Sequence, residues 1–451
     1  MNLSDDNDEK GDGKMKKKKK KKKKSKKKRK RSLSSSSSTN TANNNNNNNH
    51  TSSKRTKHHT SSYVRSTSFS STFRSSSLRA MSFSSYRSLP SSSLQPRSHS
   101  LLAQRGTSRP KSPIQTTHPD KTFHYTQRPG TVIDSKYTII SDIGLGTFGR
   151  VVKCSSVTEP FNVAIKIIRK IKKYIDSARI EADVLRDVNR QGGRGRSLCV
   201  RMWGTFMWEG HFCLIFEELG LSLYDLLKGN GYERFPMGFN WDVARDLVDV
   251  MEFLKGRNLV HTDIKLENIL LDVKESDYVY QTSPGGRQIR VPKVAKVKLC
   301  DFGGATYDNE RKGRVINTRQ YRAPEVILEL GWSTPSDMWS VGCVLAEISS
   351  GNLLFSTHSN FEHLALIERT LGRFPRHMIE RSPVKNLPFV DGVHDNAVLS
   401  GESRRYVQKV RRMEEEYVGE WGDLLRGVLE IDPGRRWKAS ECLHSYFRKR
   451  I

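Results

Sequence analysis

The stretch HTDIKLEN, residues 261–268, decides both the fold class and the chemistry predicted for this chain. It holds a carboxylate at Asp263, a cation at Lys265 and a side-chain amide at Asn268. A protein catalyses phosphoryl transfer mainly by positioning the reactants and stabilising charge. It needs a carboxylate that orients a hydroxyl and accepts its proton, a cation near the transferred group, and oxygen ligands for Mg²⁺. The stretch therefore predicts a catalytic loop with Asp263 as base, Lys265 as cation and Asn268 as metal ligand.

Two triplets downstream fit the same chemistry. DFG at residues 301–303 follows a short predicted strand, and APE at residues 323–325 closes the segment that begins at Asp301. The Asp301 carboxylate would be the second protein ligand of the metal ion.

A glycine-rich stretch upstream, GLGTFGRV at residues 144–151, lies between two predicted strands. Gly144, Gly146 and Gly149 allow the backbone to approach phosphate groups without an intervening side chain. The dinucleotide-binding fingerprint is excluded, because its last glycine opens a helix, whereas the residues from Val151 continue a strand.

The stretch VAIK, residues 163–166, places Lys166 on the third predicted strand, and Glu181 follows at the edge of a predicted helix's apolar stripe. A lysine in the core of a strand needs a charged partner. Glu181 can hold its ammonium group where nucleotide phosphates would lie. Five motifs in this order are not a chance pattern.

Residues 125–451 resemble a eukaryotic protein kinase, and their details resemble the LAMMER or CDC-like (CLK) family. The stretch EHLALIERTLG, residues 362–372, is similar to the family pattern EHLAMMERxLG. Most kinases have arginine at the position of Thr262 in the catalytic loop, and threonine there is similar to this family. Residues 272–296 resemble the family's hairpin insertion. NTRQYRAPE, residues 317–325, is also family-like.

The resemblance implies an α+β fold of two lobes, a small β-rich N-lobe and a larger helical C-lobe. It implies an ATP- and Mg²⁺-dependent serine/threonine kinase that also autophosphorylates tyrosine, and therefore dual specificity. Nucleotide-binding roles follow for Val151, Ala164, the gatekeeper Phe216, and the backbone of Glu217 and Leu219. Structural roles follow for Thr318, Asp337 and a buried ion pair between Glu325 and Arg436.

Three positions allow further interpretation. Because Thr262 replaces arginine, the base has no positive charge beside it that a phosphorylated activation loop would have to neutralise. We therefore expect activity without an obligatory upstream kinase. Asp225 either meets the ribose or a basic substrate residue, or stabilises a helix N-terminus. Cys300 is either a small buried apolar residue or a thiol that faces the nucleotide and reacts with an electrophile.

Hydrophobic periodicity predicts the secondary structure around these motifs. Strands are expected at residues 137–143, 150–155, 161–168, 200–207, 211–217 and 297–300, with a helix over 171–185. Helices of the C-lobe are expected from Val243 to Leu254, behind a cap at Asn240, and from Met338 to Ile348.

Charge and composition divide the chain of 451 residues into a tail, residues 1–120, an N-lobe, 121–217, and a C-lobe, 218–451. The tail holds 28 of the basic and 6 of the acidic residues, a net charge of +22 against +8 for the rest, and 30 serines. Such a segment cannot bury enough apolar surface to fold, so we expect disorder.

Cysteine spacing and hydropathy exclude other classes. The six cysteines form no CxxC pair or other metal-ligand spacing, so neither a zinc site nor a disulfide framework is expected. No apolar run could span a membrane or act as a secretion signal, and we expect a soluble intracellular protein.

The tail also indicates partners. Its lysine run, residues 16–24, is typical of sequences bound by nuclear import receptors or attracted weakly and nonspecifically to nucleic acid. Arg-Ser steps between residues 65 and 98 resemble the Arg/Ser-rich splicing factors that the family phosphorylates, so we expect a nuclear kinase, monomeric in its catalytic domain, with such proteins as substrates. Alternatives are the same chemistry at kinetochores during cell division, and a pseudokinase scaffold held on nucleic acid.

Overall fold

The computed structural model describes residues 124–190, 192–310 and 312–447, which all belong to one compact unit of the chain. The predictions for residues 1–120, including disorder, the import-like lysine run and the Arg-Ser steps, fall outside these residues.

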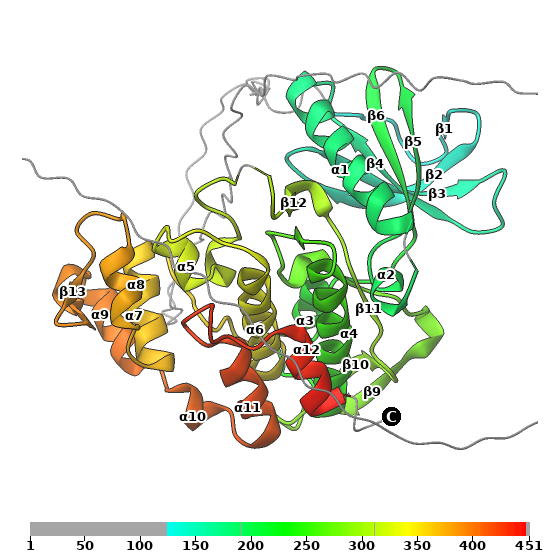
Figure 1. Ribbon diagram of the computed structural model, residues 1–451. Helices are drawn as coiled ribbons and strands as arrows, with labels where there is room; N and C mark the ends of the chain where they lie inside the picture. Colours follow the sequence, from blue (N-terminus) through cyan, green and yellow to red (C-terminus); the bar gives the residue numbers. More distant parts are fainter. Residues whose placement is uncertain (1–123, 191, 311, 448–451) are drawn as a thin grey trace, which may run out of the picture. The chain divides into compact units, whose positions relative to one another are not determined.

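A six-stranded antiparallel sheet with the strand order β1-β2-β3-β4-β6-β5 forms the N-lobe (Figure 1). Its strands are β1 Val132–Ile133, β2 Tyr137–Leu145, β3 Gly149–Ser156, β4 Val163–Ile168, β5 Met202–Trp208 and β6 His211–Glu217. Successive side chains of a strand point to opposite faces. Along β4, Val163, Ile165 and Ile167 enter the core of the lobe, which places Ala164 and Lys166 together on the other face.

Two predicted strands begin two residues later than expected. The prediction at 161–168 corresponds to β4, and the prediction at 200–207 corresponds to β5. The second difference has a tertiary cause: Cys199 pairs with Leu299 in an isolated bridge, and the Val200 N–H donates to the Leu299 carbonyl. This part of the chain therefore bonds to the C-lobe before β5 joins the sheet.

Helix α1, Lys172–Arg190, packs across the sheet and connects two hydrophobic cores (Figure 1). Ala178 and Ala182, near its middle, belong to an N-lobe cluster with Leu214 of β6. Its second half contributes Val184, Leu185 and Val188 to the large core of the C-lobe. The position of α1 is thus set by both lobes.

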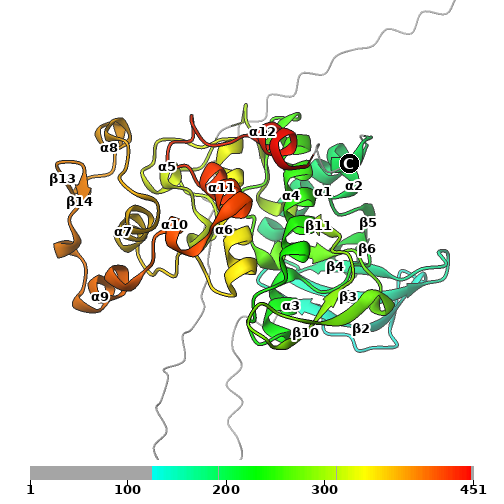
Figure 2. The same cartoon turned by 90° about the horizontal axis from the view of Figure 1, so that it is seen from below.

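The C-lobe is built around α4, Met237–Lys255, and α6, Thr334–Ser350, which lie side by side (Figure 2). The remaining helices of four or more residues are α2 Arg194–Ser197, α3 Leu223–Gly229, α5 Pro324–Ile327, α7 Asn360–Leu371, α8 Arg376–Arg381, α9 Gly401–Lys409, α10 Met413–Glu416, α11 Gly419–Val428, α12 Ala439–Cys442 and a π-helical turn, Leu443–Phe447. Buried residues run without interruption from Ser336 to Ile348, so α6 is the central helix of this lobe.

The predicted cap of α4 at Asn240 is wrong. The helix begins at Met237, after Pro236, and Asn240 lies one turn inside it, where its buried side-chain amide donates to the Phe235 carbonyl. Phe239, which is also buried, joins the core one turn before the apolar repeat that suggested the cap.

Short strands and 3₁₀ turns carry residues between α4 and α6, and one more strand pair and one more turn follow α8. The strands pair as β7 Leu259–Val260 with β12 Thr306–Tyr307, β8 Ile269–Leu271 with β11 Val297–Leu299, β9 Tyr278–Thr282 with β10 Gln288–Pro292, and β13 Phe389–Val390 with β14 Val393–His394. The turns are η2 Leu266–Asn268, η3 Glu275–Asp277, η4 Phe302–Gly304, η5 Arg319–Tyr321 and η6 Asn396–Val398. The β9–β10 hairpin lies in the predicted insertion, residues 272–296. Within the described part of the chain, no helix is long and apolar enough to cross a membrane.

Candidate active site

Three charged residues predicted for the nucleotide site meet where the two lobes contact each other. Lys166 Nζ, on β4, lies 2.8 and 2.9 Å from the two carboxylate oxygens of Glu181, on α1. The same nitrogen lies 3.2 Å from Oδ1 of Asp301, which directly follows β11 and Cys300. Glu181 is buried, and pairing is the condition under which a buried charge is stable.

These contacts fix the charges of the cluster. Burial alone would lower the pKa of Lys166, but the carboxylates of Asp301 and Glu181 outweigh it and raise the pKa above its usual value. The Lys166 ammonium lowers the pKa of the Asp301 carboxyl, against the effect of burial. Lys166 therefore stays cationic and Asp301 anionic at neutral pH, as binding of phosphate and Mg²⁺ requires.

The glycine-rich turn joins β2 to β3, and its glycines serve different purposes. The Gly146 N–H donates to the Gly149 carbonyl at 2.9 Å, which closes the turn. A Cβ at Gly149 would lie 2.3 Å from the Ile167 carbonyl oxygen, so a side chain there would separate β3 from β4. A Cβ at Gly144 would meet no atom within 4 Å, so the space beside that residue is open.

Three further residues predicted to bind the nucleotide come from neighbouring strands. Val151 of β3 pairs with Lys166 of β4, and Ala164 of β4 pairs with Phe216 of β6. All four side chains are only half-buried. The ladder thus brings Val151, Ala164 and Phe216 together around the strand that carries the lysine.

Glu217 ends β6 and Leu219 lies just beyond it, partly buried against the C-lobe core. One carboxylate oxygen of Glu217 accepts a hydrogen bond from Lys298 Nζ at 2.7 Å, and the other accepts from the Arg201 N–H at 2.8 Å. The Glu217 side chain thereby connects β6 to β11 of the C-lobe, a link that the sequence did not indicate.

Asp263 is the centre of a second cluster. Its Oδ1 accepts hydrogen bonds from the hydroxyl and the N–H of Thr318, at 2.8 and 3.2 Å. Its Oδ2 accepts from Lys265 Nζ at 2.7 Å and from the Asn268 amide at 3.3 Å. Burial lowers the pKa of Lys265, but the Asp263 carboxylate outweighs it, so the net pKa is raised and Lys265 is cationic.

The donor set fits a magnesium ion held jointly with nucleotide phosphates. The Asn268 side-chain nitrogen donates to both the backbone and the carboxylate of Asp263, which directs its amide oxygen away from that residue. The Asp301 carboxylate is about half exposed, at 48%. Two oxygen ligands of this kind suit Mg²⁺, which usually binds one or two carboxylates together with phosphates and water. Among the described residues, no group of three or more His, Cys, Asp and Glu forms a metal cage.

Asp337 of α6 holds the backbone of the catalytic loop. Its carboxylate accepts hydrogen bonds from the His261 N–H at 2.6 Å and the Thr262 N–H at 3.1 Å. Burial raises its pKa to about 6, against these hydrogen bonds and the nearby His261. The His261 ring bonds the Cys300 carbonyl at 3.0 Å and packs edge-on against Phe302, so the catalytic loop and the DFG triplet are connected.

Thr262 adds a second link, to the residue that directly follows that triplet. The residue has a positive φ of 71°, and its hydroxyl donates to the Gly304 carbonyl at 2.8 Å. A Cβ at Gly304 would lie 2.7 Å from the Thr262 hydroxyl oxygen, so glycine at 304 and threonine at 262 fit each other.

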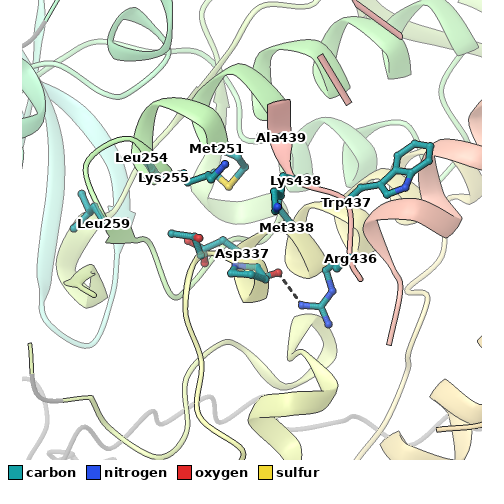
Figure 3. A pocket seen from close by; sticks show the side chains of 12 residues that line it. Met251, Leu254, Lys255, Leu259, Asp337, Met338, Arg436, Trp437, Lys438 and Ala439 are labelled. Atoms are coloured by element: carbon teal, nitrogen blue, oxygen red, sulfur yellow. Dashed lines mark hydrogen bonds between the residues drawn. The ribbon is translucent and has the colours of Figure 1, made fainter. Parts of the chain in front are cut away.

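Glu325 and Arg436 lie away from these clusters and form a bidentate ion pair. The two guanidinium nitrogens lie 2.7 and 2.8 Å from the two carboxylate oxygens, and both side chains are buried. Arg436 also donates to the Pro335 carbonyl beside a hollow lined by Met251, Asp337 and Trp437, among others (Figure 3). Among the described residues that line this hollow, none is one of those predicted to bind the nucleotide.

Two other sequence interpretations can be placed. Asp225 belongs to the first turn of α3, where its N–H donates to the Ser222 hydroxyl and its carboxylate accepts from the same hydroxyl. Helix α7 covers most of residues 362–372, and Leu366 and Ile367, which replace two methionines, are fully buried. Side chains of similar volume can fill such positions at little cost.

Cys300 is half-buried and lies next to Asp301, while Cys154, Cys199, Cys213, Cys343 and Cys442 are buried. Burial raises the pKa of the Cys300 thiol well above its usual value, and Glu217 and Asp301 add to the shift. Because the thiolate is the reactive form, we expect slow alkylation at pH 7.

We expect iodoacetamide to add once, at Cys300, with a rate that rises about tenfold for each pH unit between 7 and 9. Intact-mass measurement against pH follows the reaction, and ATP should slow it. A pH-independent rate, or an adduct that survives Cys300→Ser, would contradict this expectation.

Three residues that the structure connects were not indicated by any sequence motif. Asp187 of α1 accepts hydrogen bonds from Arg257 and Tyr307, each at 2.6 Å. Tyr307 is 120 positions from Asp187, and none of the three belongs to a motif. The only local signal was the position of Tyr307 shortly after the DFG triplet.

Known proteins share this fold and much of this sequence. The protein kinase domain model matches residues 137–447. Serine/threonine-protein kinase AFC1 of Arabidopsis thaliana is 39% identical over 349 residues, covering 73% of this chain and 74% of AFC1. Dual specificity protein kinase CLK2 of Homo sapiens is 39% identical over 338 residues, covering 73% of this chain and 67% of CLK2. The crystal structure of the kinase domain of PF14_0431 matches with a TM-score of 0.68 at 36% identity, covering 73% of this chain and 99% of that one.

These findings confirm the two-lobed α+β kinase fold, and with it protein kinase activity that uses ATP and Mg²⁺. The serine/threonine and dual-specificity names of the relatives agree with the activity expected from the motifs. The chain belongs to the protein kinases and, within them, to the LAMMER or CDC-like (CLK) family.

Proposed function

We propose that Lys166, Glu181, Asp301 and Asn268 hold ATP and its magnesium ion in this kinase. The observation that supports this most directly is the position of Lys166 Nζ, within 3.2 Å of both Glu181 and Asp301. Mg²⁺, when bound, neutralises charge on the phosphates. Lys166 orients the phosphates as a fixed cation, and Glu181 keeps it from turning away.

Asp263 is proposed as the base for the substrate hydroxyl. Its carboxylate is oriented by Thr318 and Lys265, and it remains 31% exposed. A serine, threonine or tyrosine hydroxyl that reaches this carboxylate would lose its proton to it as the phosphoryl group arrives. Lys265 would stabilise the negative charge of the moving group.

The activation segment of this kinase is proposed to need no phosphorylation by an upstream kinase. Thr262 carries no charge that a phosphate would have to neutralise. Its hydroxyl instead bonds Gly304, and β12 pairs with β7 directly before the catalytic loop. These neutral contacts support an active arrangement of the segment.

Nuclear Arg/Ser-rich proteins are the proposed substrates, with the nucleus as the site of action. The basis is the kinase's own sequence: a lysine run of the nuclear-import type at residues 16–24, and Arg-Ser steps from residues 65 to 98. The tail would then be both an address for an import receptor and a substrate in cis.

Phosphopeptide mapping tests the proposed substrate class. After incubation of the full chain with ATP, we expect phosphoserines between Ser66 and Ser112, and none in the Asp301→Asn variant. If the unaltered kinase phosphorylates a control peptide while these serines stay unmodified, the Arg/Ser proposal fails and the kinase assignment stands.

Such phosphorylation would also change the tail's charge. Each phosphate adds about −1.5 to −2 charge, so on the order of a dozen phosphoserines would cancel the net +22 of residues 1–120. Weak contact of the tail with nucleic acid would then be lost.

A further inference from the structure

Asp187 receives two hydrogen bonds on one carboxylate oxygen. The Arg257 guanidinium and the Tyr307 hydroxyl each donate to Oδ2 at 2.6 Å. The hydrogen bond from Tyr307 is the main reason for the lowered pKa of Asp187, and Arg257 adds to it against burial. The carboxylate is thus an anion held by two donors, which we call the Asp187 clasp.

Both donors belong to the catalytic half of the molecule. Arg257 precedes β7, which leads directly into His261 and the catalytic loop. Tyr307 is in β12, where it pairs with Leu259 of β7. The two donors are therefore fixed to each other by a strand pair, and α1 reaches them from the N-lobe.

The clasp lies on the same helix as the partner of Lys166. Glu181 and Asp187 are six residues apart on α1, which corresponds to about 9 Å along a helix. A helix transmits displacement along its axis, so movement of α1 away from the catalytic loop at Asp187 would also move the Glu181 carboxylate. Leu185 and Val188 also hold α1 against the C-lobe core, but apolar contacts do not depend on direction. The hydrogen bonds of Asp187 do, because they require particular angles.

We propose that Asp187 is a positioning residue for ATP: with Arg257 and Tyr307 it holds α1 where Glu181 can orient Lys166, without a phosphate on the activation segment. The inference rests on the proposed role of Lys166 and Glu181 in nucleotide binding. A kinase whose activation segment is phosphorylated gains charge-assisted bonds to order this region. Here the carboxylate of Asp187, on α1, accepts these hydrogen bonds without any phosphorylation.

The effect on kinetics distinguishes positioning from general stability. If α1 is displaced part of the time, only a fraction of the enzyme binds ATP productively, and the apparent affinity falls by that fraction. Saturating ATP then draws the enzyme back to the competent arrangement. The KM for ATP should therefore rise while kcat changes little.

An Asp187→Asn variant of the full chain tests the clasp, with Asp183→Asn as the matched control. Asp183 is on the same helix, is 74% exposed and pairs only locally with Arg186. We expect Asp187→Asn to raise the KM for ATP about three- to tenfold, as loss of charge-assisted hydrogen bonds on a partly exposed group implies, with the KM for the peptide unchanged. Asp183→Asn should match the unaltered kinase.

A Tyr307→Phe variant provides a second readout with only one oxygen removed. It should raise the KM for ATP by a smaller factor, and adding it to Asp187→Asn should raise the KM no further, because the two residues act through one contact. Hydrogen exchange of the amides of residues 184–190 should become faster in both variants and not in Asp183→Asn.

The proposal is overturned if Asp187→Asn has the KM of Asp183→Asn, if kcat falls at an unchanged KM for ATP, or if the effects of the two variants multiply. A Lys166→Met variant distinguishes failure of the clasp from failure of the proposed nucleotide site. Full activity of Lys166→Met would refute the role of Lys166, whereas an inactive Lys166→Met with a silent Asp187→Asn would refute the clasp alone.

Discussion

An Asp263→Asn variant is expected to transfer phosphate about 10²–10⁴-fold more slowly than the unaltered kinase, the range typical for removal of a general base. Asparagine has nearly the same shape but cannot accept a proton from the substrate hydroxyl. In the unaltered kinase, Lys265, Asn268 and Thr318 all donate hydrogen bonds to the Asp263 carboxylate. The NH₂ group of asparagine would face one or more of these donors and could not accept from them. The loss should appear in kcat, measured with a Ser/Thr peptide at saturating ATP.

Two controls make this result specific. Binding of ATP, followed by thermal shift, should be nearly retained, because Lys166, Glu181 and Asp301 are untouched. Asp423→Asn should be fully active, since Asp423 is 55% exposed on α11 and contacts its helical neighbour Arg426. An Asp263→Asn variant with more than a tenth of the original kcat would show that another group accepts the proton.

The residues proposed to carry the chemistry could be selected from the sequence because each motif combines a charged side chain with a local structure that the sequence also indicates. Lys166 is one example: its place in an alternating strand requires a partner, and Glu181 was the carboxylate at the edge of the next helix's apolar stripe. The prediction that Asn240 caps α4 also used only local sequence, and it was wrong. A capping residue is recognised from its own neighbours, and Pro236 began the helix one turn earlier.

The contacts that escaped prediction are tertiary and lie outside motifs. Arg257 and Tyr307 are 70 and 120 positions from Asp187, and nothing in their neighbours indicates that they share one oxygen atom. The fit of Gly304 to the Thr262 hydroxyl is of the same kind. Thr262 was visible in the sequence as a departure from the common kinase pattern, but only its distance from Gly304 explains why these two residues occur together.

Loss of the Arg436 side chain is expected to cause the largest loss of stability among single substitutions discussed for this domain. In Arg436→Met the Glu325 carboxylate would be buried without its partner, and three carbonyls, of Pro335, Glu430 and Ile431, would lose their donor. Breaking a buried ion pair from one side typically costs about 3–5 kcal/mol. At about 2 °C per kcal/mol for a domain of this size, the melting temperature should fall by roughly 6–10 °C in calorimetry.

The adjacent arginine is a matched control for that loss. Arg435 is 74% exposed and lies 3.9 Å from Glu430, so Arg435→Met should leave the melting temperature within about 1 °C of the unaltered kinase. A Glu325→Leu/Arg436→Met double variant should recover part of the stability lost in Arg436→Met, because it no longer buries an unpaired carboxylate. If the double variant were less stable than Arg436→Met, the unpaired Glu325 carboxylate would not be the cause of the stability lost in Arg436→Met. If Arg436→Met melted like Arg435→Met, the pair would not stabilise the C-lobe.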